Sequence, residues 1–405
     1  MIKRELYTNR ILEFVDKPFV KVITGLRRSG KSTILFLIWE ELLQRGTNPD
    51  RIIRINMESF DFSNLSIARE FYDYVKSKIQ SNEIHYLLID EIQEVHEWEK
   101  AINALMVDLN VDIFITGSNS RLLSSELSTY LTGRYVEFSV LPLSFREFLN
   151  FSQNRNVVYK DNTQAFDIFM KLGGFPALHT AEYSCDAAYR IVYDIYSSAI
   201  LRDTIQRYNI RDVELLERVV KYVFDNIGNR FSAKNVADYF KSQQRKMDLN
   251  TVYNYLYALE SAFIIYRIPR YDIKGKEILK THEKYFAGDP SLLYSVMGFK
   301  EGMISGILEN IVMLEIKRRG YNVYVGKEGV REVDFIAERN KNKVYIQVTY
   351  MTTTPETLSR EIAPLKNIDD NFSKYIISLY APWGDNIDGI KHLSIIEFLL
   401  KENWE

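Results

Sequence analysis

An eight-residue segment near the start of the chain, Gly25-Leu26-Arg27-Arg28-Ser29-Gly30-Lys31-Ser32, constrains the fold most strongly. It matches G-x-x-x-x-G-K-[ST] at every position, follows a predicted strand and opens a predicted helix. Glycines at 25 and 30 let consecutive backbone N–H groups face one anion, and the helix start adds its positive dipole end. The segment therefore predicts a phosphate-binding loop. The expected ligand-binding residues are Gly25, Arg27, Arg28, Ser29, Gly30, Lys31, Ser32 and Thr33.

The surrounding residues alternate between short β-branched stretches and amphipathic stretches. Strands are expected at 19–24, 51–56, 84–90, 111–116 and 135–140, with helices at 31–44, 67–80 and 98–109. Strands separated by helices need crossover connections, which favour a mainly parallel sheet with helices on both faces. The predicted fold class is α/β, with a P-loop core over residues 1–145.

Two carboxylates, Asp90 and Glu91, follow the apolar strand expected at 84–90. The carboxyl ends of parallel strands meet at the edge of the sheet where ligands bind. We expect Asp90 and the hydroxyl of Ser32 to hold Mg²⁺, directly or through water. Glu91 is the expected catalytic carboxylate that polarises the attacking water, and Lys31 is expected to reach the β- and γ-phosphates.

Polar residues after the strand at 111–116 supply further candidates. If that strand lies between the first and third strands, Ser118 or Asn119 would lie beside the γ-phosphate, and Asn119 is assigned a catalytic role. A guanidinium can neutralise charge on the transferred phosphoryl group, and of Arg121 and Arg134 we favour Arg134. The alternatives are an ordinary turn after the strand and a surface salt bridge for the arginine.

Taken together, these motifs resemble the prokaryotic AAA-type ATPases that carry a C-terminal domain of unknown function. The similarity covers nearly the whole chain, and it implies ATP binding and hydrolysis, with ATP and Mg²⁺ as ligands. It says little about what hydrolysis drives. The runs that carry the resemblance are Gly25 to Ser32, Leu88-Ile89-Asp90-Glu91-Ile92-Gln93, Thr116-Gly117-Ser118-Asn119-Ser120, Leu131-Thr132-Gly133-Arg134, Leu141-Pro142-Leu143-Ser144-Phe145-Arg146-Glu147-Phe148 and Gly173-Gly174-Phe175-Pro176.

A helical lid is expected over 146–200 and a winged-helix-like domain over 201–297. The latter has predicted helices at 213–226, 233–241 and 251–261, then strands at 264–271 and 278–287. Residues 230–284 contain eleven Lys and Arg against six Asp and Glu, which allows DNA binding. Packing and protein contacts are the alternative. The residues considered for DNA contact are Arg267, Arg270, Lys274 and Lys276 at the hairpin, and Thr251, Tyr253, Asn254, Tyr255 and Tyr257 on the helix.

The region 298–405 resembles the PD-(D/E)xK nuclease-like fold, with Glu309 on a helix and Asp334 on a strand. In an active member, positions 347 and 349 would be an acid and a lysine. Here they are Gln347, a poor Mg²⁺ ligand, and Thr349, which has no ammonium group. We therefore expect a scaffold that binds nucleic acid or protein without nuclease activity.

The 52 basic and 54 acidic side chains give a net charge of -2, so DNA binding would need a local patch. A single cysteine, Cys185, and the absence of an apolar leader or a span of about 20 apolar residues predict a cytoplasmic protein without membrane contact.

The leading hypothesis is an Mg²⁺-dependent regulatory ATPase whose nucleotide state repositions C-terminal binding domains. A protein partner of unknown identity is expected, and self-association is allowed. The alternatives are a non-hydrolysing, nucleotide-dependent DNA- or protein-binding switch and, less favoured, a small-molecule P-loop kinase.

Overall fold

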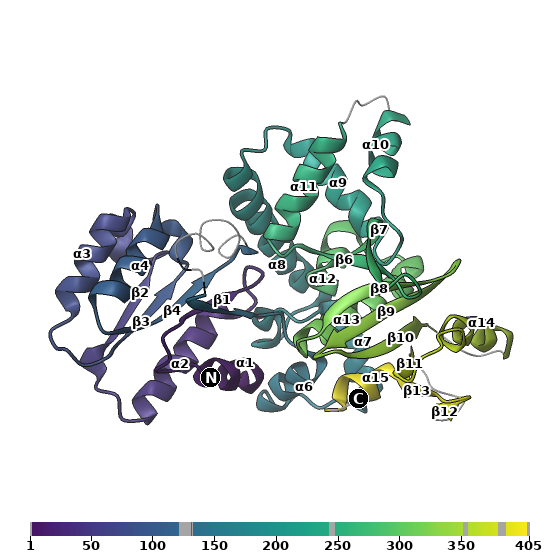
Figure 1. The fold of residues 1–405 in the computed structure, drawn as a ribbon, viewed down its shortest axis with the longest axis horizontal. Helices are drawn as coiled ribbons and strands as arrows, with labels where there is room; N and C mark the ends of the chain where they lie inside the picture. The colour runs from purple at the N-terminus through teal and green to yellow at the C-terminus, as the bar shows by residue number, and fades with distance from the viewer. Residues whose placement is uncertain are drawn as a thin grey trace. The chain divides into compact units, whose positions relative to one another are not determined.

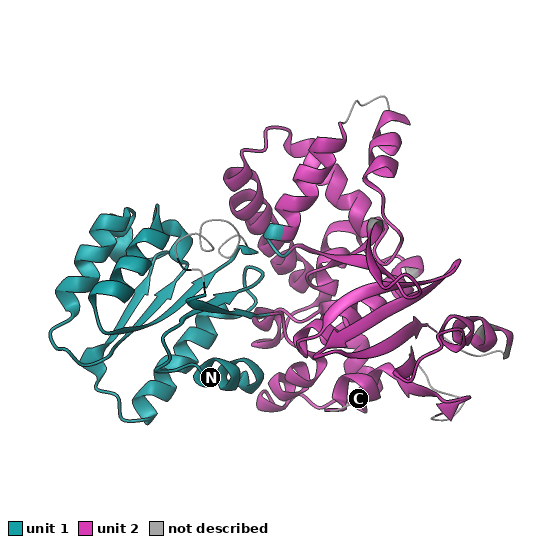
Figure 2. Cartoon of the chain, in the orientation of Figure 1, with its two compact units in different colours: residues 1–140, 261–263 teal, residues 141–260, 264–405 magenta. Residues whose placement is uncertain are grey.

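The computed structural model of the chain describes residues 2–120, 131, 133–242, 248–350, 355–379 and 386–402. The chain divides into two compact units, coloured separately in Figure 2. Unit 1 comprises residues 1–140 with 261–263, and unit 2 comprises residues 141–260 with 264–405. Both contain helices and a sheet, which confirms the α/β class.

Unit 1 is built on a five-stranded sheet in which every strand pair is parallel. The strand order is β2-β3-β4-β1-β5, so β4 lies between β1 and β3 as the sequence predicted (Figure 1). All five predicted strands are present, each within one residue of its predicted ends. The strands are β1 (Val20–Thr24), β2 (Ile52–Asn56), β3 (His85–Asp90), β4 (Val111–Gly117) and β5 (Tyr135–Ser139).

Helices cover both faces of this sheet because neighbouring strand residues point to opposite sides. Leu87 packs in one core cluster with residues of α3 (Ala68–Lys78) and α4 (Trp98–Asp108). The next residue, Leu88, packs in a second cluster with residues of α1 (Glu5–Leu12) and α2 (Lys31–Gln44). The two faces can be followed in Figure 1. The described part of this unit also contains three short 3₁₀ helices: η1 (Pro49–Arg51), η2 (Phe60–Leu65) and η3 (Ile92–Glu94).

Unit 2 contains an eight-stranded mixed sheet in the order β12-β13-β11-β10-β9-β8-β6-β7 (Figure 1). Its strands are β6 (Ile265–Asp272), β7 (Glu277–Ala287), β8 (Asn322–Glu328), β9 (Arg331–Arg339), β10 (Asn342–Thr349), β11 (Ser373–Ser378), β12 (Asn386–Ile387) and β13 (Ile390–Ser394).

The helices of unit 2 begin with a capping box, in which Ser144 and Glu147 exchange backbone and side-chain hydrogen bonds. This box explains the Leu-Ser-Phe-Arg-Glu segment of the sequence as a helix start. The helices are α6 (Phe145–Asn154), α7 (Asn162–Leu172), η5 (Pro176–His179), α8 (Cys185–Ser198), η6 (Ala199–Gln206), α9 (Val213–Asp225), α10 (Ala233–Ser242), α11 (Leu249–Ser261), α12 (Pro290–Met297), η7 (Glu301–Met303), α13 (Ile304–Arg318), α14 (Pro355–Lys366) and α15 (Ile395–Leu400).

The hairpin formed by β6 and β7 is part of this large sheet, because β6 pairs in parallel with β8. The sequence analysis placed this hairpin in a winged-helix-like region and assigned 298–405 to a separate domain. The local order of three helices and a hairpin is present, but the sheet is continuous across residue 297. Pairing with β8 satisfies the outer edge of β6, which an isolated hairpin would leave open.

The Gly173-Gly174 pair has a packing role in unit 2. A Cβ atom at Gly173 would lie 1.8 Å from Oδ1 of Asp289, and one at Gly174 would lie 2.4 Å from the carbonyl oxygen of Leu143. The backbone N–H of Gly174 donates to Asp289 at 2.7 Å. The glycines therefore allow a close approach that any larger side chain would prevent.

Candidate nucleotide site

The glycine-rich loop joins the end of β1 to the start of α2. Gly25 has a φ of 146°, and a Cβ atom there would lie 2.2 Å from the carbonyl oxygen of Val140. Gly30, with a φ of 103°, is the N-cap of α2. Both positions therefore require glycine. Arg28 also has a positive φ, 65°, so the loop follows a strongly curved path.

Lys31 lies inside this curve and is buried. Its ammonium donates to the carbonyl oxygens of Gly25 at 3.0 Å and Leu26 at 3.3 Å, and lies 3.7 Å from Oε1 of Glu91. The hydroxyl of Ser29 is buried and has no hydrogen-bond partner among the described residues. A cation and an unused hydroxyl thus lie on one curved loop, which suits an anionic ligand.

Arg4, which no sequence motif indicated, contacts this loop from the N-terminal segment. Arg4 is 1% exposed, and its guanidinium donates to the carbonyl oxygen of Ser29 at 2.7 Å and lies over the ring of Tyr7. No motif joins residues 4 and 29, so only the folded chain reveals this contact.

Asp90 and Glu91 end β3 at the same edge of the sheet as the loop. The hydroxyl of Thr116, from β4, donates to Oδ1 of Asp90 at 2.5 Å and accepts the backbone N–H of Glu91 at 2.9 Å. Ser32 also hydrogen-bonds to Asp90. The neighbouring strands β3 and β4 and the start of α2 therefore bring together the hydroxyls of Thr116 and Ser32 and the two carboxylates.

The two carboxylates have different electrostatic environments. Burial raises the pKa of Asp90 above its ordinary value, despite the hydrogen bonds from Thr116 and Ser32. Burial opposes ionisation of Glu91 as well, but Lys31, the amide of Gln93 and the charge of Arg27 outweigh it and lower the pKa of Glu91. Divergent pKa values in adjacent carboxylates are typical of sites where the two groups have different tasks.

Other predicted residues differ in how close they come to this centre. Ser118 hydrogen-bonds to Glu91, and Asn119 is fully buried just beyond β4. Arg27 pairs with Glu58 at 3.1 Å. Arg28 is exposed, and Thr33 is half-buried in the first turn of α2. Arg121 falls outside the described residues.

Arg134 lies at the end of the sheet where the strands start, opposite the end that carries the phosphate loop. It immediately precedes β5, and its carbonyl oxygen accepts the N–H of Val20, the first residue of β1. Because β1 and β5 are parallel, residues before β5 lie where the strands start, whereas the phosphate loop follows the end of β1. The structure therefore does not bring Arg134 to the loop of its own chain.

The arrangement fits ATP and Mg²⁺. The curved backbone and Lys31 match the phosphates, and the oxygens of Ser32 and Asp90 are hard ligands of the kind Mg²⁺ prefers. Because burial raises its pKa, Asp90 is protonated more readily here than a free carboxylate. A bound cation beside Asp90 would favour the charged form.

A second group of charged residues lies in unit 2, where the sequence resembles a nuclease. The ammonium of Lys284, on β7, lies 3.1 Å from Glu309, 3.0 Å from Glu332 and 3.3 Å from Asp334. Burial opposes the charge of Lys284, but these carboxylates outweigh burial and raise its pKa. Burial raises the pKa of Glu309 to about 8, with Asp334 adding to the shift. A lysine from outside the resemblance therefore occupies the centre of the acidic cluster.

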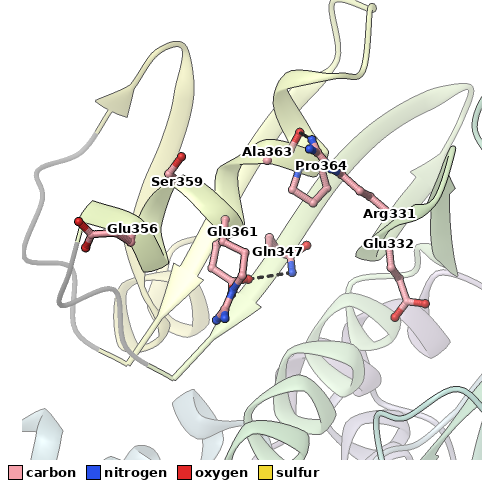
Figure 3. Close-up of a pocket in the computed structure, with 9 residues that line it drawn as sticks. Arg331, Glu332, Gln347, Glu356, Ser359, Glu361, Ala363 and Pro364 are labelled. Atoms are coloured by element: carbon pink, nitrogen blue, oxygen red, sulfur yellow. Dashed lines mark hydrogen bonds and ion pairs between the residues drawn. The ribbon is translucent and has the colours of Figure 1, made fainter.

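Gln347 also lies near this cluster. Its side-chain oxygen accepts the backbone N–H of Asp334 at 3.4 Å, and its amide nitrogen donates to Glu361 at 3.1 Å, drawn as a dashed line in Figure 3. A groove of about 850 Å³ adjoins these residues. Its lining combines glutamates with Arg331 and Arg360, so the charges do not specify one kind of ionic ligand.

The basic hairpin is less available to DNA than the sequence suggested. Arg270, one of the residues considered for DNA contact, is buried. Arg267 lies 3.9 Å from Glu260, and Lys274 pairs with Glu328 at 2.9 Å. On α11, Tyr255 is buried too, which leaves Tyr253, Asn254 and Tyr257 exposed. Neither a winged helix nor DNA binding is confirmed.

The parallel sheet, the phosphate loop with its buried lysine and the acidic pair define a P-loop ATPase of the AAA type. Residues 17–149 match the family profile described as an AAA domain. Residues 163–302 match the profile of a domain of unknown function, and thus lie mostly before the expected C-terminal domain at 298–405. The nuclease-like fold of that region stays a prediction.

Two relatives extend the match over nearly the full chain. An uncharacterised protein of Haemophilus influenzae is 38% identical over 402 residues, covering 99% of each chain. An uncharacterised protein of Methanocaldococcus jannaschii is 32% identical, covering 86% of this chain and 78% of that protein. The chain belongs to the family of AAA-domain proteins that includes these two.

The Walker-type ATPase of Pyrococcus abyssi has a similar fold, with a TM-score of 0.53 and 16% identity over 73% of this chain and 96% of that one.

Among the described residues, no helix combines the length and apolarity needed to cross a bilayer.

Proposed function

We propose that this AAA-type ATPase hydrolyses ATP at the loop of unit 1 and uses the nucleotide state to reposition binding surfaces of unit 2. The observation that carries the proposal is the contact of Lys31 with Glu91. ATP phosphates would draw the ammonium of Lys31 away, which would leave the carboxylate of Glu91 able to accept a hydrogen bond from water. Nucleotide binding would thereby change the charge balance at the end of β3.

Each residue has a separate role in this proposal. The loop backbone and Lys31 bind the phosphates, and the oxygens of Ser32 and Asp90 hold Mg²⁺, which would neutralise phosphate charge when bound. Glu91 orients the attacking water and takes its proton. Asn119 contributes from the end of β4. Arg134 could stabilise the transferred phosphoryl group only from another copy of the chain, which makes self-association part of its predicted role.

The main alternative is a switch that binds ATP without hydrolysing it. The position of the Glu91 carboxylate beside the phosphate loop favours hydrolysis, because a carboxylate charged at neutral pH can accept a proton from the attacking water. A kinase for small molecules would instead transfer phosphate to an added acceptor.

The Glu91→Gln variant tests the proposal, with Glu94→Gln on the neighbouring η3 as a matched control. Glu94 is exposed and lies three residues further along. We expect Glu91→Gln to bind Mg²⁺-ATP normally and to release phosphate about 10² to 10³ times more slowly than the wild type, because it has lost the base. Wild-type phosphate release by Glu91→Gln would reject the role of Glu91, and ATP binding without release in every variant would favour the switch.

The partner of unit 2 is proposed to be a protein. The burial or ion pairing of Arg270, Arg267 and Lys274 argues against a DNA-contacting hairpin. Salt-dependent binding of duplex DNA that is lost in Lys274→Ala/Lys276→Ala protein would overturn this preference.

A further inference from the structure

Gln93 makes a contact with Glu91 that the roles above do not use. It lies on η3, two residues after Glu91, and its amide nitrogen donates to Oε2 of Glu91. The other carboxylate oxygen, Oε1, is the one that faces Lys31 at 3.7 Å. Lys31 of the loop and Gln93 of the segment that follows β3 therefore contact different oxygens of Glu91, and Ser118 is a further hydrogen-bond partner of this carboxylate.

Two unfavourable features adjoin this contact. Glu91 has left-handed backbone angles, with φ 54° and ψ 53°, which are unfavourable for a non-glycine residue. The carbonyl oxygen of the Gln93 side chain is buried and accepts no hydrogen bond among the described residues. Buried acceptors without partners are rare and destabilising. Strain and an unused acceptor beside one buried carboxylate are typical of a functional arrangement.

We propose that Gln93 is a positioning residue, whose amide holds Oε2 of Glu91 so that Oε1 faces the attacking water once Lys31 has moved to the phosphates. The proposal rests on the function proposed above, in which Glu91 is the base. A base held by a third group is a recurring arrangement in catalysis, because the hydrogen bond fixes the direction of the proton-accepting atom.

Several groups besides Gln93 act on the carboxylate of Glu91. Lys31 and Arg27 favour the charged carboxylate, as does the Gln93 hydrogen bond, whereas burial opposes it. Asp90 is the adjacent negative charge. In the nucleotide complex Lys31 would be engaged by phosphate, so the hydrogen bond of Gln93 would become a larger share of what holds the Glu91 side chain in place.

The test compares Gln93→Met, which keeps the length of the side chain and removes the donor, with Glu94→Met, an exposed control on the same short helix. We expect Gln93→Met to lower kcat about 10- to 100-fold, because a misplaced base loses its geometry. The KM and the Kd for Mg²⁺-ATP should stay within about twofold of the wild type, since neither depends on a transition-state contact.

Combining Gln93→Met with Glu91→Gln separates the two proposals. If Gln93 acts through Glu91, the double variant should be no slower than Glu91→Gln alone. A wild-type kcat in Gln93→Met would overturn the role of Gln93 and leave the role of Glu91 in place. The same would follow if Gln93→Met lowered kcat by as large a factor in the Glu91→Gln protein as in the wild type. Wild-type turnover in Glu91→Gln would instead overturn the proposed function.

Discussion

Buried charged groups support the phosphate loop at the level of single residues. The guanidinium of Arg4 donates to the carbonyl oxygen of Ser29, which directly follows Arg28, a non-glycine residue with a positive φ. Hydrogen bonds from charged donors contribute about 1.5–3 kcal/mol, which is enough to select one loop conformation.

Replacing Arg4 should therefore weaken nucleotide binding without any direct contact with the nucleotide. We expect Arg4→Met to raise the Kd for Mg²⁺-ATP about 10-fold or more, because the binding-competent loop becomes one of several conformations. Lys3→Met, at the exposed neighbouring position, should bind like the wild type. Equal affinities of the two variants in calorimetry would show that Arg4 does not shape the loop.

The sequence predicted the residues whose roles come from a local motif. Lys31, Ser32, Asp90 and Glu91 lie at the edge of the sheet that the sequence indicated, although their catalytic roles stay predictions. Thr116 joins the acidic pair only through the pairing of β3 with β4, and therefore could not be assigned from sequence spacing. The position of Arg134 followed from strand direction, which the sequence analysis did not consider.

At the level of elements, the acidic cluster of unit 2 depends on a contact between β7, α13 and β9. Lys284 is the shared partner of Glu309, Glu332 and Asp334, and Arg230 adds a second cation, 2.6 Å from Glu332. The nuclease resemblance concerned only residues after 298, so a lysine from the preceding hairpin was outside it.

Lys284→Met should destabilise unit 2 in a pH-dependent way. Breaking a buried ion pair costs about 3–5 kcal/mol, because carboxylates are left unpaired. Without the ammonium, the pKa values of Glu309 and Asp334 would rise further above their unfolded values, so the native state would bind protons that the unfolded state releases. The loss should therefore be small near pH 5 and grow as the pH rises to 8.

Urea unfolding at pH 5 and pH 8 measures this effect, with Lys276→Met at an exposed turn as the control. A Lys284→Met protein as stable as the control at pH 8 would mean that the cluster does not need its lysine.

At the level of the whole molecule, features set by local sequence were predictable, whereas features set by pairing between distant segments were not. The five strands of unit 1 were predictable because each is a short run rich in β-branched or aromatic residues, which is a local signal. The eight-stranded sheet was not, because the pairing of β6 with β8 joins segments more than 50 residues apart and leaves no periodic signal. Residues 201–297 and 298–405 consequently looked separate in the sequence, although one sheet runs through both.

The other proposed roles depend on hydrolysis of ATP at the loop of unit 1. Steady-state phosphate release from Mg²⁺-ATP, measured for the wild type and for Lys31→Ala, tests it most directly. Lys31 supplies the buried ammonium of the loop, so the account predicts turnover by the wild type, with neither turnover nor calorimetrically detectable ATP binding by Lys31→Ala. Wild-type rates and affinity in the Lys31→Ala protein would contradict it.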